Sequence, residues 1–251
     1  MKARADLGLR ALKPRDPNEA HDGQWWNSRV PKADIFWTAR LFPGSSDQRL
    51  SVDVRQLVTA NDCVIYNDLE AHGLRVSNPA ECNQDIFRIY KHSRIKQINP
   101  YHYQYDEQIF GCELFMYPYE LRASQQGDCD DWGIELASYL ITAGVPAWRV
   151  RCVAGWCREG GGHLTVYVLG DDRKTWYHLN STTGWEVVRS RGCERLTDFP
   201  TSKDENDGIG IGEVWFSFNN EYAWHKFETE ASLQNARATG WMKSIVIRPA
   251  Y

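Results

Sequence analysis

The spacing of apolar residues changes from helical to alternating near the middle of the chain. Before residue 92, apolar side chains recur three or four positions apart, which predicts helical segments over 54–58, over 65–72 and from a cap at Asn78 to Tyr90. After Pro146 the period becomes two, which predicts strands. These strands are expected over 148–154, 163–169, 174–180, 214–218 and 244–247. The strand over 148–154 is expected to be amphipathic, with Arg149 and Arg151 on its polar side.

Residues 1–48 follow neither period. They are polar, interrupted by proline, and carry the isolated aromatic pairs Trp25–Trp26 and Phe36–Trp37. This composition predicts an extended N-terminal arm, followed by a single domain over 49–251. The aromatic pairs either pin the arm to the core of the chain itself, which is the commoner case, or bind a partner protein.

The segment Gln125–Gly133 joins a glycine-containing loop to an apolar helix that is predicted to end at Gly144. Cys129 lies in the first turn of this helix. Unpaired N–H groups at a helix N-terminus favour the thiolate, and they make Cys129 a candidate nucleophile. The neighbouring residues Asp128, Asp130 and Asp131 oppose ionisation of the thiol. A histidine partner is therefore required.

A predicted hairpin supplies that histidine. If Asp171 and Asp172 are the two central residues of its turn, His163 faces Asn180 on the same side of the sheet. The Asn180 amide can then hold one ring N–H of His163 and orient the other ring nitrogen toward a thiol. A shift of one residue would send Asn180 to the other face. His178, on the same face, is the competing histidine and is expected to be structural, opposite Thr165.

These segments resemble the transglutaminase-like branch of the papain-type cysteine hydrolases, including the bacterial transglutaminase-like cysteine peptidases. The resemblance covers residues 100 to 185, in the segments Gly127–Asp131, Gly162–His163 and Leu179–Thr182 and in a lead-in over Met116–Glu120. It implies an α+β fold with the helix of the nucleophile packed on an antiparallel β-sheet, and acyl transfer through a thioester. The chain departs from that branch at Asn180, where aspartate is usual and the papain branch has asparagine.

The sequence thus predicts an enzyme that hydrolyses an amide or peptide bond. Cys129 would attack the carbonyl, His163 would carry the proton and Asn180 would orient His163. Gln125 or Gln126 could complete an oxyanion site with the backbone N–H of Cys129, and Trp132, Trp148 or Trp156 could line the groove. Two alternatives stay open: a cross-linking transglutaminase, and a non-catalytic structural or assembly component that keeps the fold.

Composition limits the expected partners and the expected cellular compartment. The net charge of −4 and the absence of a basic run with interleaved aromatics argue against nucleic acid as a partner. No signal peptide or apolar membrane span is recognisable, and seven scattered cysteines indicate free thiols in a reducing compartment. The expected protein is cytoplasmic, alone or within a larger assembly, and needs no cofactor or metal. Its expected partners are a peptide or protein substrate and, through the arm, another protein.

Overall fold

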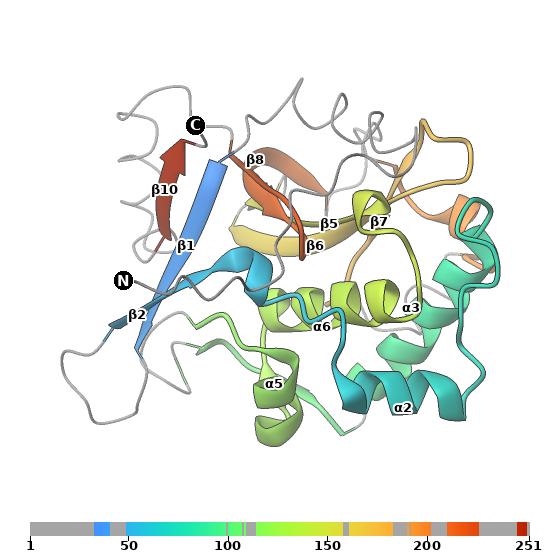
Figure 1. Cartoon of the computed structure of the whole chain (residues 1–251), viewed down its shortest axis with the longest axis horizontal. Coiled ribbons are helices and arrows are strands. Elements are labelled where there is room, and N and C mark those ends of the chain that lie inside the picture. Colours follow the sequence, from blue (N-terminus) through green and yellow to red (C-terminus); the bar gives the residue numbers. More distant parts are fainter. Residues whose placement is uncertain are drawn as a thin grey trace, which may run out of the picture.

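The computed structural model describes residues 33–40, 49–98, 100–106, 108, 114–157, 161–182, 190, 192–201, 210–225 and 245–249. Within these ranges the fold is α+β, with helices packed on an antiparallel sheet of order β7-β6-β5-β8-β9 (Figure 1). The strands of this sheet are β5 (Val150–Cys157), β6 (Gly162–Leu169), β7 (Trp176–Leu179), β8 (Ile211–Phe218) and β9 (Ala223–His225). The described helices are α2 (Cys63–Ala71), α3 (Asn83–Ile98), α5 (Pro118–Ser124) and α6 (Cys129–Thr142), with 3-10 turns η1 (Val54–Gln56), η2 (Ala147–Arg149) and η3 (Leu196–Asp198).

Helix α6 is the central element of the core. Every side chain in it except that of Ile141 is buried, because the helix lies between the large sheet and helices α2, α3 and α5. It starts at Cys129, and Gly144 follows its end with a φ of +105°, a left-handed conformation that glycine adopts without strain. The predicted helix and its glycine stop are confirmed.

Gly133 allows α6 to pack closely on the sheet. A Cβ atom at this position would lie 2.5 Å from Leu164 Cδ2 and 3.6 Å from Ser181 Oγ. The backbone of α6 therefore approaches β6 and the end of β7 directly. Leu164 and Ser181 each follow one of the two predicted site residues, His163 and Asn180.

Helix α3 begins at Asn83, four residues later than the sequence predicts. Asn78 caps only a local turn, with Ala80 N–H donating to its side chain over 3.1 Å. The cap of α3 is Asp171, a residue of the β6–β7 loop, which accepts from the N–H groups of Cys82 at 2.8 Å and Asn83 at 3.2 Å. A cap supplied from so far along the chain leaves no local pattern in the sequence.

The β6–β7 hairpin is confirmed with a different register. Val166 pairs with Leu179, whereas a two-residue turn would pair it with Tyr177. The loop spans the six residues 170–175, with Arg173 at a φ of +57° and Asp172 accepting from the N–H groups of Lys174 and Thr175. This displacement by two residues leaves His163 and Asn180 on one face of the sheet as diagonal neighbours.

The prediction that the strand over 148–154 is amphipathic is wrong, because Arg149 and Arg151 are both fully buried. Arg149 pairs with Asp171 at 2.8 Å and donates to the Leu169 carbonyl. The Arg151 guanidinium lies 3.7 Å from the centre of the Trp224 ring. Arg149 thus has a carboxylate partner near the start of α3, and Arg151 lies against an aromatic ring.

A second sheet, of order β10-β1-β2, lies beside the first (Figure 1). It contains β1 (Ala33–Arg40), β2 (Arg49–Asp53) and β10 (Ile245–Pro249). Residues 33–40 of the expected arm therefore form its central strand, and Trp37 is buried and stacked on Phe115 at 4.3 Å. Residues 1–32 lie outside the described ranges. The helix expected over 54–58 is only the turn η1, which Asp53 caps.

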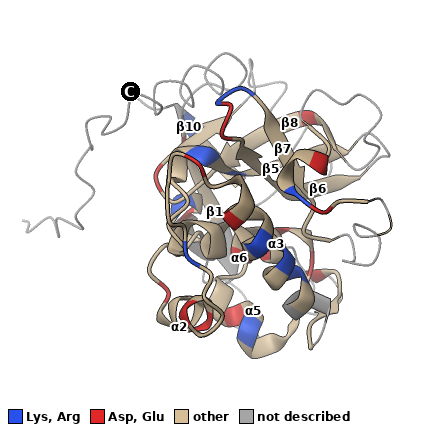
Figure 2. Cartoon of the chain, turned by 90° about the vertical axis from the view of Figure 1, so that its right-hand side faces the viewer, with Lys and Arg blue, Asp and Glu red and all other residues tan. Residues whose placement is uncertain are grey.

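Basic and acidic residues are interspersed over the described elements in Figure 2. Among the described residues, none of the helices combines the length and the apolar content that crossing a membrane requires.

Candidate active site

Cys129 occupies the first position of α6 and is buried, with 4% of its surface exposed. Asp128 caps the helix, and its own N–H donates to Asp131 Oδ2 over 3.0 Å. Cys129 Sγ lies 3.9 Å from Asp130 Oδ1. The thiol is thus close to the positive end of the helix dipole and also to carboxylates that oppose its ionisation.

His163 lies at the start of β6, opposite Gly155 of β5. Burial lowers the pKa of its imidazole to about 4, nearby His178 adds to the decrease, and hydrogen bonding with Asn180 acts in the opposite direction. At neutral pH the ring is therefore uncharged. Its Nε2 atom is buried and has no hydrogen-bond partner among the described residues, so this nitrogen is available to a reacting group.

Asn180 follows directly after β7 and is held by its neighbours. Its Oδ1 accepts from the Thr182 N–H at 2.9 Å and from the Thr182 hydroxyl at 2.8 Å, and its carbonyl accepts from the Tyr90 hydroxyl at 2.8 Å. These contacts fix the side chain next to His163. His178 is engaged elsewhere, with Nε2 2.8 Å from the Thr165 hydroxyl and its ring stacked on Tyr167. The sequence predicts Thr165 directly opposite His178. In the structure Tyr167 is opposite His178, and Thr165 contacts it as a diagonal neighbour.

Helix α6 relates Cys129 to the β6–β7 hairpin through the packing of Gly133. Cys129 lies one helical turn, about 6 Å along the axis, before Gly133. Gly133 in turn contacts the residues that follow His163 and Asn180. Alternation along β6 turns Leu164 toward α6 and His163 toward the other face. Because His163 is the second residue of β6, the start of α6 reaches its imidazole around the end of the strand.

The predicted oxyanion and groove residues lie on several different elements of the fold. Gln125 is exposed and ends α5 in a left-handed conformation, whereas Gln126 is half-buried in the short strand β4 (Gln126–Gly127). Trp132 is buried in α6, and Trp156 is 41% exposed at the end of β5 near His163. Trp148 lies in η2, far from His163. It precedes Val150, which pairs with Val168, five residues or about 16 Å along β6 from His163.

Tyr103 lies near Cys129, which the sequence did not reveal. It belongs to β3 (His102–Tyr103), which pairs in parallel with β4 just before Cys129. Burial raises the pKa of its hydroxyl, and the charges of Cys129 and Asp128 raise it further. Its ring meets Trp132 edge to face at 5.3 Å. Only the abundance of tyrosine in this region could have drawn attention to it, since the pairing is non-local.

Four buried carboxylates gather at the same helix start. We call Asp106, Asp128, Asp130 and Asp131 the carboxylate cluster; one oxygen from each lies within 4.8 Å of the others. Burial, together with the charges of Asp106 and Asp128, raises the pKa of Asp131 well above its usual value. Oxygen ligands of this kind suit a hard divalent cation such as Ca²⁺. The sequence prediction assigned no metal site here.

No protein-family profile matches the chain, and no curated protein matches its sequence. Among solved structures, LapG of Legionella pneumophila is similar, with a TM-score of 0.45 and 17% identity over 76% of this chain and 94% of that one. The calcium-bound form of LapG has the same score and identity over 66% and 80% of the two chains. The EGTA-treated form of LapG has the same TM-score, identity and coverage as the first of these structures.

Proposed function

We propose that the protein is a cysteine-dependent acyl-transfer enzyme that hydrolyses an amide or peptide bond through a thioester. The observation that carries the proposal is the close packing of Gly133 against the residues that follow His163 and Asn180. In the proposal, the start of α6 with its Cys129 thiol acts beside the end of the hairpin, which carries a neutral histidine and a fixed amide.

The proposed reaction begins with a neutral pair. Because burial depresses the pKa of His163 and carboxylates surround Cys129, the resting site holds a thiol and an uncharged imidazole. His163 removes the thiol proton as the sulfur attacks the carbonyl carbon. The imidazolium then gives that proton to the leaving amine, and the C–N bond breaks. Water, deprotonated by His163, cleaves the resulting thioester to a carboxylic acid and restores the thiol.

The surrounding groups have supporting roles in this proposal. The N–H of Cys129 is the first donor to the developing oxyanion, and Gln126, half-buried in β4, is a better second donor than the exposed Gln125. Asn180 orients the ring of His163 but stabilises its charged form less than a carboxylate would. A divalent cation on the carboxylate cluster would offset negative charge beside the thiol.

Alkylation of the native protein, followed by peptide mapping, tests the proposal. Cys82 and Cys152 serve as internal references for unreactive thiols, because burial raises the pKa of both; Cys63 is exposed and reports general access of the reagent. We expect Cys129 to react faster than Cys82 and Cys152, and His163→Ala to slow Cys129 without changing Cys63. Equal sluggishness of all the buried thiols would favour the non-catalytic structural component instead.

A further inference from the structure

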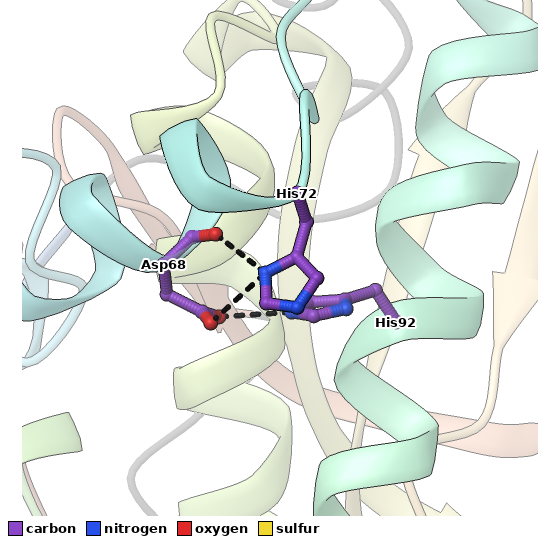
Figure 3. Close-up of side chains that lie close together, drawn as sticks. All are labelled: Asp68, His72 and His92. Carbon is purple, nitrogen blue, oxygen red and sulfur yellow. Dashed lines mark hydrogen bonds and ion pairs between the residues drawn. The ribbon is translucent and has the colours of Figure 1, made fainter.

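A second group of ligand-type side chains lies away from Cys129, between α2 and α3 (Figure 3). Asp68 belongs to α2, His72 caps the C-terminal end of that helix, and His92 belongs to α3. His72 Nδ1 lies 3.4 Å from Asp68 Oδ1, and His92 Nε2 lies 2.9 Å from Asp68 Oδ2. One ligand atom from each of the three residues lies within 4.8 Å of the others.

We propose that Asp68, His72 and His92 bind a divalent transition-metal ion, Zn²⁺ foremost. Two imidazoles and one carboxylate are the ligand types that Zn²⁺ takes at bond lengths of about 2.0–2.2 Å. Around a tetrahedral ion such bonds separate neighbouring ligand atoms by roughly 3.3 Å. The distance from His72 Nδ1 to Asp68 Oδ1 already has this value, and that from His92 Nε2 to Asp68 Oδ2 needs to open by only a few tenths of an ångström. Each imidazole thus faces a different oxygen of the carboxylate.

The residues around the three ligands favour a metal site over a simple ion pair. The Tyr139 hydroxyl donates to Asp68 Oδ2 over 2.8 Å, which is the kind of outer contact that orients a ligating carboxylate. The His72 and Asp68 positions are four apart on one helix, so both face the same side. Their rigid placement against α3 and α6 is set by the fold before any ion binds.

Exposure indicates how the ion would enter. The His72 side chain is 51% exposed, whereas those of His92 and Asp68 are 16% and 14% exposed. The ion would therefore reach the site from the His72 side and keep at least one position for water. Binding would displace the proton shared between His92 and Asp68 and the contact of His72 Nδ1 with the Asp68 carbonyl at 2.8 Å.

Titration of the full-length protein with Zn²⁺ and Co²⁺ tests the proposal. The protein should carry Cys63→Ser and Cys129→Ser, which remove the exposed thiol and the thiol at the carboxylate cluster, and excess Ca²⁺ should be present to occupy that cluster. We expect one equivalent of Zn²⁺ to bind by calorimetry, and bound Co²⁺ to show visible ligand-field bands without sulfur charge transfer.

Three variants separate this site from other binding. His72→Ala, at an exposed position, should weaken Zn²⁺ binding at least tenfold, and Tyr139→Phe should weaken it about 10–100-fold through the outer contact. His102→Ala, an exposed histidine outside the group, should leave the affinity unchanged. Absence of stoichiometric binding, or equal affinity in His72→Ala and the parent protein, would overturn the proposal. Circular dichroism of each variant confirms that the fold is retained.

Discussion

The depressed pKa of His163 predicts a specific sensitivity of the fold to acid. Its folded pKa is about 4, against 6.5 for an unperturbed imidazole, and the first cause is burial. The unfolded state therefore takes up a proton at a higher pH than the folded state. Stability from the neutral ring is fully present above pH 6.5 and is lost as the pH falls through the folded value.

The magnitude follows from these two values. At about pH 5 the unfolded ring is almost fully protonated and the folded ring almost fully neutral, which corresponds to a loss of about 2 kcal/mol relative to neutral pH. At about pH 4 the loss reaches about 3 kcal/mol. For a domain whose free energy of unfolding is typically about 5–15 kcal/mol, this is a substantial part of the total.

Urea unfolding at neutral pH and at about pH 5 measures the effect in the wild type and in His163→Asn. Asparagine keeps a polar group at the position but does not titrate, so the variant should lose about 2 kcal/mol less than the wild type between the two pH values. Titration of all other groups contributes to both proteins and cancels in the comparison. Equal losses in the two proteins would refute the view that His163 is buried and neutral.

Three further predictions follow from the same structure. Asp171→Ala should lower the free energy of unfolding by about 3–5 kcal/mol, because it removes the carboxylate partner of the fully buried Arg149 and the cap of α3. Asp172→Ala, in the same loop, should cost about 1 kcal/mol, and similar losses in urea unfolding would argue against the long-range cap. Asn180→Asp should raise the pKa of His163 by about 1–3, as followed by NMR titration of the ring, and an unchanged pKa would mean that the two side chains do not interact. Ca²⁺ that binds the carboxylate cluster should stabilise the folded protein by about 2.7 kcal/mol at a hundredfold excess over Kd. The melting temperature should therefore rise with the Ca²⁺ concentration, and an unchanged melting temperature would exclude a cation site there.

The sequence predicts the elements that depend on local patterns. The helix that starts at Cys129 and stops before Gly144 could be recognised from its apolar period and its glycine, and the β6–β7 hairpin from its alternation. The register of the hairpin could not be recognised, because the pair Asp171–Asp172 is typical of a tight two-residue turn. In the structure Asp171 instead caps α3 and pairs with Arg149, which lengthens the loop and displaces β7 by two residues.

The parts of the site that escaped prediction depend on contacts between distant segments. Tyr103 approaches Cys129 only because β3 pairs with β4, and Asp106 joins the carboxylate cluster from outside the Cys129 segment. Trp148 shows the limit of sequence proximity, since it precedes β5 at the end of the strand away from the pair Gly155–His163. An even displacement of the register preserved the relation between His163 and Asn180, whereas an odd one would have separated them.

The most direct test of the central claim is to look for the covalent intermediate. Incubation with an activated ester, followed by rapid acid quench and mass spectrometry of peptides, should reveal an acyl group on Cys129 as a thioester. His163→Ala should form little of it, while acylation of the exposed Cys63 should be unchanged. Acylation confined to Cys63, or acylation of Cys129 that is equally fast in His163→Ala, would contradict the proposal that these residues act together as nucleophile and base.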